Sequence, residues 1–151
     1  MLKSRGYTGR TDHKVDSKGR LSIPALIRKD IAPGQDDEVA VVLVPSGHLL
    51  LFNREYWDTS IQQNIIDQEE KIGKEKVWRA ISEVSENCHM SKVDSHGRVS
   101  IPRWMLDDTG ITSDAIVIGL FDRLSVWAPD RHKKWKAEEN LDPIISAIGL
   151  Y

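Results

Sequence analysis

The chain has 151 residues, of which 40% are hydrophobic and 29% are charged, and its formal net charge is −2. This length fits one globular domain or two small fused domains, and the hydrophobic content supports a core. The single cysteine excludes a disulfide framework, no apolar run is long enough to cross a membrane, and the first residues lack the apolar core of a signal peptide.

The charge is distributed unevenly. Residues 1–30 hold eight Lys and Arg against three Asp, a net charge of +5, and the remaining residues carry −7. Such asymmetry predicts a basic face on an otherwise acidic body, which suits a polyanionic partner. The alternative interpretation is a solvated run of charge with no partner.

The first predicted structural unit begins with a strand at residues 13–15 and continues into the sequence VDSKGRLSIP at residues 15–24. Asp16 and Gly19 are typical of a four-residue turn, because the Asp side chain bonds backbone N–H groups and Gly accepts a positive φ. Residues 20–23 then alternate polar and apolar side chains, as a half-buried strand does. Pro24 is expected to be the first residue of a short helix. We therefore expect a hairpin followed by a helix.

Two strands and two helices should follow. Residues 39–44 form a continuous β-branched run, which predicts a strand buried on both faces, and residues 45–48 turn it back into a strand at 49–52. Asn53 is expected to cap a helix. Gly73 separates that helix from a second amphipathic helix over residues 74–86. The two helices carry apolar stripes, formed by Trp57, Ile61 and Ile65 and by Val77, Ile81 and Val84.

The sequence VDSHGRVSIP at residues 93–102 repeats the first motif after 78 residues, with eight of ten positions identical. The differences are Leu21/Val99, which is conservative, and Lys18/His96, which is not. Asp94 and Gly97 repeat the turn residues. A match of this kind indicates an internal duplication, so we interpret the fold as one unit built twice.

The second unit repeats the order of the first, with a short helix after Pro102, a buried strand at 115–120 and a strand at 124–127. A basic helix begins at Pro129, and the apolar tail at 142–151 is expected to dock on its own or another subunit. The predicted division is a first unit at 7–53, linking helices at 54–87, a second unit at 88–128, and a C-terminal helix and tail at 129–151.

The sequence contains no recognisable catalytic or metal site. Its five His residues are scattered, and it has neither a Gly-rich phosphate loop nor a nucleophile elbow. We therefore expect no enzyme activity, cofactor, metal or small-molecule substrate. Arg cannot act as a base, so Asp16 and Asp94 are interpreted as structural residues of the turns, and Arg20 and Arg98 as exposed donors.

Donors on a rigid hairpin suit DNA. An Arg fork matches guanine or phosphate oxygens, and a two-stranded ribbon fits the major groove. Lys14 and Lys18 lie beside the first turn, so they are also predicted to bind DNA. Because the second turn carries His96 in place of lysine, Arg20 is expected to contribute more than Arg98.

The paired Asp-x-x-Gly-Arg-x-x-Ile-Pro motifs, Tyr7 two residues before Gly9, and the linking helices resemble the MraZ family, bacterial regulators of the division and cell-wall gene cluster. The resemblance covers about residues 7–135. It implies an α+β fold of two tandem AbrB-like β-units, packed pseudo-symmetrically, with linking and C-terminal helices. It also implies a ring of subunits that binds repeated promoter boxes.

The resemblance assigns particular residues. The DNA-contacting Asp-x-x-x-Arg motif of the family falls on Asp16 to Arg20 and on Asp94 to Arg98. The family's Arg four residues after the motif Pro is Arg28 in the first unit, which adds Arg28 to the predicted DNA-binding residues. Leu106 replaces it in the second unit, and Ser125 stands where the family usually has Glu.

The predicted function is that of a cytoplasmic, nucleoid-associated transcriptional regulator that binds double-stranded DNA as a homo-oligomer. One alternative is an AbrB-type autoregulatory repressor that acts as an antitoxin. Another is a structural ring or interaction module that does not bind DNA. Salt dependence separates the last alternative, because phosphate contacts weaken steeply with salt.

Overall fold

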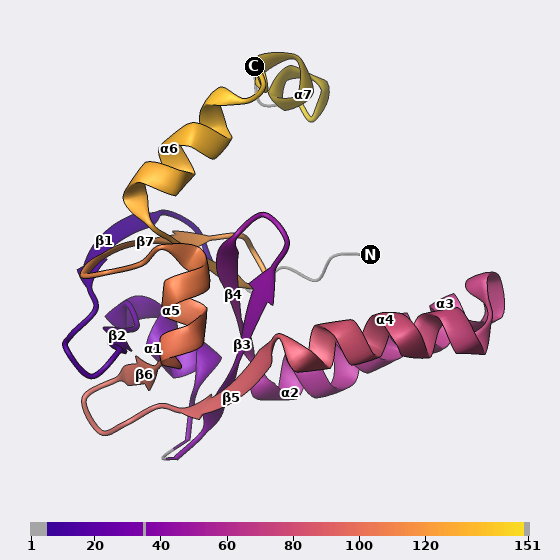
Figure 1. The fold of residues 1–151 in the computed structure, drawn as a ribbon, viewed down its shortest axis with the longest axis horizontal. Helices are drawn as coiled ribbons and strands as arrows, with labels where there is room; N and C mark the ends of the chain where they lie inside the picture. Colours follow the sequence, from indigo (N-terminus) through magenta and orange to yellow (C-terminus); the bar gives the residue numbers. More distant parts are fainter. Residues whose placement is uncertain (1–5, 35, 150–151) are drawn as a thin grey trace.

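The computed structural model describes residues 6–34 and 36–149, which form an α+β fold. The strands make one six-stranded antiparallel sheet and one two-stranded ribbon (Figure 1). They are β1 (Arg10–Lys14), β2 (Arg20–Ser22), β3 (Glu38–Val44), β4 (His48–Asn53), β5 (Cys88–Lys92), β6 (Arg98–Ser100), β7 (Asp114–Gly119) and β8 (Leu124–Trp127).

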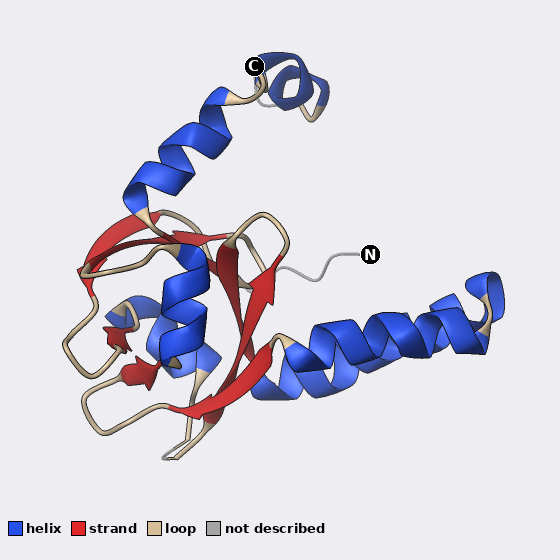
Figure 2. Ribbon diagram, in the orientation of Figure 1, coloured by secondary structure: helices blue, strands red, loops and turns tan. Residues whose placement is uncertain are grey.

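The helices are α1 (Ala25–Ile31), α2 (Arg54–Tyr56), the π-helical turn η1 (Trp57–Ile61), α3 (Gln62–Ile72), α4 (Lys74–Glu86), α5 (Arg103–Thr109), α6 (Pro129–Ala137) and α7 (Asp142–Ala147). The short helices α1 and α5 lie next to the strands, whereas α3 and α4 and the C-terminal helices extend away from them (Figure 2). The predicted bounds of the helix over 74–86 are confirmed. Pro24 and Pro102 cap α1 and α5 and are not their first helical residues.

The two repeats exchange strands. The order in the large sheet is β1-β7-β8-β4-β3-β5, so β1 of the first repeat pairs with β7 of the second, and β5 of the second pairs with β3 of the first. The predicted tight turn forms in each repeat, closed by hydrogen bonds from the Gly19 and Gly97 N–H groups to the carbonyls of Asp16 and Asp94, but the flanking strands pair mainly with the other repeat. Only single bridges, Val15–Leu21 and Val93–Val99, join the strands that flank each turn, because the other repeat satisfies their remaining backbone groups. The large sheet contains strands of both repeats. The predicted four-part division of the chain stays a prediction.

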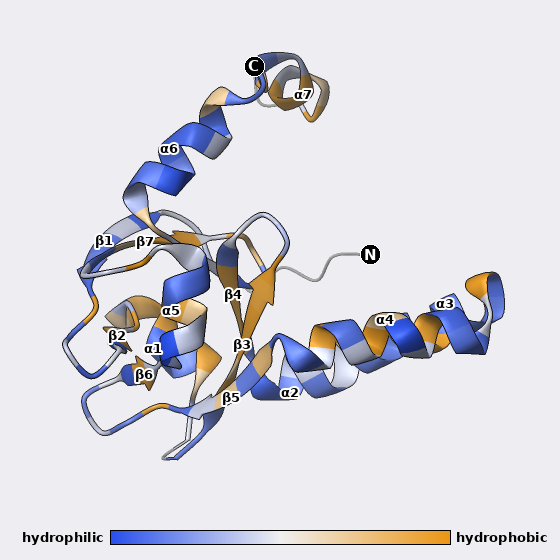
Figure 3. Cartoon of the chain, viewed as in Figure 1, coloured by the Kyte–Doolittle hydropathy of each residue, from blue (hydrophilic) through white to orange (hydrophobic). Residues whose placement is uncertain are grey.

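The core lies between the sheet and the ribbon, and both faces of β3 are covered. Val39 and Val41 join the main cluster, while Ala40 and Val42 pack with Phe52 in a second cluster on the opposite face. Figure 3 shows the continuous apolar colour along β3. The prediction of a strand buried on both faces is therefore confirmed.

The linking helices form a protruding hairpin (Figure 1). Asn53 caps its start, as predicted, by accepting a hydrogen bond from the Tyr56 backbone N–H at 2.9 Å. Trp57 and Ile61 pack on the second cluster, but Trp78, further along, is half exposed. An apolar groove runs along this hairpin, lined by residues that include Ile65, Ile72, Val77, Ile81 and Val84.

The C-terminal helices lead away from the sheet. His48 on β4 stacks on Trp127 with ring centroids 3.9 Å apart, and Trp135 of α6 packs on the same indole. Burial, followed by the neighbouring charge of His132, lowers the pKa of His48 to about 4. Beyond α6, Ile144 of α7 and the following residue Ile148 remain uncovered, with exposed fractions of 53% and 67%. The described part of the tail therefore does not dock on its own chain.

Candidate nucleic-acid interface

Strands β2 and β6 form a short antiparallel ribbon that joins the two motifs. Leu21 faces Val99 at its centre, and both side chains are buried in the core. Because side chains alternate along a strand, the flanking residues point outward. Arg20 therefore lies opposite Ser100, and Arg98 lies opposite Ser22. The outward face carries two arginines in diagonal positions, with Cα atoms about 7–8 Å apart.

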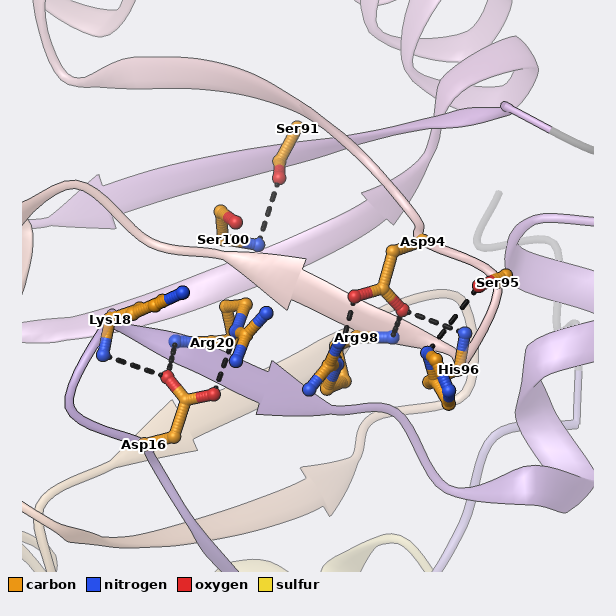
Figure 4. A network of polar contacts seen from close by, with 9 residues as sticks. All are labelled: Asp16, Lys18, Arg20, Ser91, Asp94, Ser95, His96, Arg98 and Ser100. Carbon is orange, nitrogen blue, oxygen red and sulfur yellow. Dashed lines mark hydrogen bonds and ion pairs between the residues drawn. The ribbon is translucent and has the colours of Figure 1, made fainter.

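The first turn is organised by the Asp16 carboxylate (Figure 4). Its Oδ1 accepts hydrogen bonds from the backbone N–H groups of Lys18 at 3.0 Å and Arg20 at 2.9 Å. Its Oδ2 accepts from Arg20 Nε at 2.7 Å. Gly19 has a φ of +78°, which an L side chain adopts only with strain. One carboxylate thus fixes both the turn and the direction of the guanidinium.

The second turn reproduces this geometry. Asp94 Oδ1 accepts from the backbone N–H groups of His96 and Arg98, both at 2.9 Å, and Oδ2 accepts from Arg98 Nε at 2.8 Å. The backbone N–H of Arg98 contributes most to lowering the pKa of Asp94 to about 2, and the same kind of bond from Arg20 lowers the pKa of Asp16. Both turns are therefore built around ionised carboxylates.

This pairing predicts how the turns respond to acid. A depressed carboxyl pKa gives stability that is present above the ordinary value of 3.8 and is lost as the pH falls through the folded-state value, about 2 for Asp94. We expect a side-chain NMR titration of Asp94 to have its midpoint near 2. A midpoint at 4 or above would contradict the hydrogen bonding of the turn.

The arginines are less exposed than predicted. The side chains of Arg20 and Arg98 are 29% and 27% exposed, because each Nε is held by its Asp. Within the described residues, their terminal nitrogens Nη1 and Nη2 have no hydrogen-bond partner, so both nitrogens of each fork, with four N–H donors, remain available. A guanidinium whose orientation is already fixed loses little entropy when it binds a planar acceptor pair.

Each turn is also held by the other repeat. The backbone N–H of Ile23 donates to the carbonyl of Gly97 at 2.9 Å, and that of Ile101 donates to the carbonyl of Gly19 at 2.8 Å. The two turns therefore lie at opposite ends of one ribbon, as Figure 4 shows, and form a single pseudo-symmetric face. We did not predict from the sequence that the two motifs would meet.

The remaining predicted DNA-binding residues lie in different surroundings. Lys18 is exposed at the tip of the first turn and has no recorded ion-pair partner within the described chain. Lys14, at the end of β1, forms an ion pair with Asp114 on β7. Arg28 does not lie on the outward face of the ribbon, since its guanidinium packs behind Gly97 of the second turn.

Other kinds of site find little support in the described residues. No group of three or more His, Cys, Asp and Glu side chains is arranged to hold a metal ion. Among residues 6–34 and 36–149, no helix is both long enough and apolar enough to span a membrane. What the structure does bring together is a ribbon with two oriented guanidinium forks.

A duplicated fold with an arginine-bearing two-stranded ribbon is the arrangement expected of a DNA-binding transcriptional regulator, since such ribbons can enter the major groove. A family described as "MraZ protein, putative antitoxin-like" matches the chain in two successive segments, residues 7–77 and 86–145. The chain belongs to the MraZ family, which is non-enzymatic.

Curated relatives agree with this assignment. The transcriptional regulator MraZ of Chlorobaculum parvum is 31% identical over 140 residues, covering 83% of this chain and 81% of the relative. The proteins of the same name from Chlorobium phaeobacteroides and Bacteroides fragilis are 28% and 29% identical. They cover 83% and 85% of this chain and 85% and 80% of their own lengths, respectively.

Proposed function

We propose that the chain binds double-stranded DNA sequence-specifically through the β2–β6 ribbon and regulates transcription as an oligomer. In this proposal, Arg20 and Arg98 read base edges in the major groove, while Lys18 contacts phosphate. The supporting observation is the fixed direction of both guanidinium groups, because a bidentate contact to guanine requires an oriented fork. The DNA sites are repeated promoter boxes of the division and cell-wall gene cluster, as the family resemblance implies.

A salt titration tests this function. The protein is mixed with labelled DNA from upstream of its own gene and with random DNA of equal length. We expect tighter binding to the upstream fragment and a linear fall of log K with log salt, with a slope of about −0.9 for each phosphate contacted. Binding that is absent, or that does not depend on salt, would favour the protein-interaction module instead.

We further propose that the oligomer is a closed ring built by head-to-tail contacts between copies. Two apolar features are left uncovered by the described chain, namely the groove along α3 and α4 and the exposed pair formed by Ile144 of α7 and Ile148, which caps the end of that helix. They project from the body in different directions (Figure 1). A contact between unlike surfaces repeats from copy to copy and closes into a ring when its rotation permits. The occupant of the groove is therefore α7 of a second copy.

The double variant Ile144→Asp/Ile148→Asp is expected to reduce the oligomer to smaller species, because it places two charges on the apolar face of α7. Light scattering at micromolar concentration measures the change. Ser146→Asp adds a charge to the opposite side of the same helix and is expected to leave the oligomer intact. A wild-type protein that scatters as a single 17.1 kDa species would contradict the assembly.

A further inference from the structure

The two repeats differ at the side chain that packs behind each turn. A Cβ built on Gly19 would lie 3.3 Å from Leu106 Cδ1, so an apolar side chain of α5 fills the space behind the first turn. At the second turn, a Cβ built on Gly97 would overlap the guanidinium of Arg28. Arg28 and Leu106 occupy equivalent positions, four residues after the motif Pro. Each helix therefore supports the turn of the other repeat.

The side chains at the tips of the turns differ in charge in the opposite way to those behind the turns. Lys18 lies at the tip that Leu106 supports, and His96 lies at the tip that Arg28 supports. Each Arg of the ribbon is paired with its own Asp, so neither pair adds net charge to the face. The net positive charge at the first turn therefore comes from Lys18. At the second turn it comes from Arg28, which has no recorded ion-pair partner among the residues described.

The position of Arg28 lowers the stability of the fold. Its Nε is buried without a hydrogen-bond partner, and an unsatisfied buried donor destabilises a fold. A leucine occupies the same position in the other repeat, so packing alone does not require a cation there. A charge directly behind Gly97 lies close enough to the ribbon to attract a bound phosphate, because screening in physiological salt acts over about 8 Å.

We propose that Arg28 is the cationic residue of the second half of the DNA-binding ribbon, supplying from the first repeat the charge that His96 does not supply. This inference rests on the proposed DNA-binding function. It makes Arg28 part of the second turn in space, although it belongs to the first motif in sequence. Each half of the ribbon then has one unpaired cation. This reduces the difference between the contributions of Arg20 and Arg98 to DNA binding that the sequence predicts.

The test combines Arg28→Leu with the rescue variant Arg28→Leu/His96→Lys. Arg28→Leu puts a leucine behind the second turn. Leu106 already fills the equivalent position behind the first turn, so the fold should tolerate the change. We expect Arg28→Leu to lower the salt slope by about one unit per engaged ribbon and to weaken binding about five- to tenfold at 0.1 M salt. The rescue variant, which carries a lysine at the tip of the second turn, should regain both the slope and the affinity.

The controls separate charge from structure. Thermal melts of both variants should lie close to that of the wild type, and Lys29→Leu removes a neighbouring exposed charge of α1 that does not pack behind a turn. A wild-type salt slope in Arg28→Leu would overturn this inference alone. Loss of binding that His96→Lys does not rescue would assign Arg28 a structural role and would also overturn it. Wild-type protein that binds no DNA at any salt concentration would overturn the proposed function and this inference together.

Discussion

The double variant Arg20→Ala/Arg98→Ala is expected to lose discrimination between operator and random DNA. A well-placed bidentate arginine contributes about 1–3 kcal/mol of discrimination against a wrong base, so two such residues contribute about 2–6 kcal/mol. Because their charges are neutralised by Asp16 and Asp94, non-specific binding should fall less than specific binding. Competition binding with operator and random duplexes measures the two affinities separately.

The matched control for this variant is Arg79→Ala. Arg79 is an exposed arginine of α4 that is also paired with an acidic residue, Glu75, but it lies on the protruding helical hairpin. It should leave both affinities unchanged. If the double variant kept its preference for the operator, the ribbon would not be the surface that reads sequence.

The second large effect is expected from Gly19→Ala, which should destabilise the protein and weaken DNA binding. Alanine at a φ of +78° costs about 1–2 kcal/mol, and its Cβ would lie 2.8 Å from the carbonyl oxygen of Ile101, a backbone atom that cannot move aside easily. Forcing such a contact adds about 1–3 kcal/mol. We expect a loss of about 2–5 kcal/mol in the free energy of unfolding, measured by urea denaturation.

Gly110→Ala is the control for backbone strain alone. Gly110 ends α5 with a φ of +70°, but a Cβ there would approach only the end of a side chain, Arg131 Nη2, at 3.3 Å. This variant should lose only the conformational cost of about 1–2 kcal/mol. Equal losses in the two variants would show that the close approach of Gly19 to the other repeat does not matter.

Local features of the fold were predictable because local interactions determine them. Gly73 ends one helix and begins the next, Asn53 caps its helix through its own side chain, and the run at 39–44 reads as a doubly buried strand. Strand pairing was not predictable in the same way. A strand of three residues such as β2 carries no signal for its partner, and the duplicated motif is equally compatible with a hairpin within each repeat.

The same distinction between local and long-range interactions applies to the candidate site. The Asp-x-x-Gly-Arg spacing predicted a turn whose Asp bonds the backbone ahead of it, which is a local property. The placement of Arg28 behind Gly97 depends on how the repeats pack against each other, and the sequence showed only that Arg28 and Leu106 differ. One sequence difference bears on this placement. The change from Lys18 to His96 removes a lysine from the tip of the second turn, which is the turn that Arg28 contacts.

Site-specific photo-cross-linking tests most directly the proposal that the β2–β6 ribbon binds DNA. A photoreactive residue is placed at Ser22 or Ser100, both exposed on the outward face of the ribbon, and in a control at Ser82, an exposed serine of α4. With operator DNA bound, we expect cross-links from both ribbon positions and none from the control. Cross-links from Ser82, with none from Ser22 or Ser100, would contradict the assignment of the β2–β6 ribbon as the DNA-binding surface.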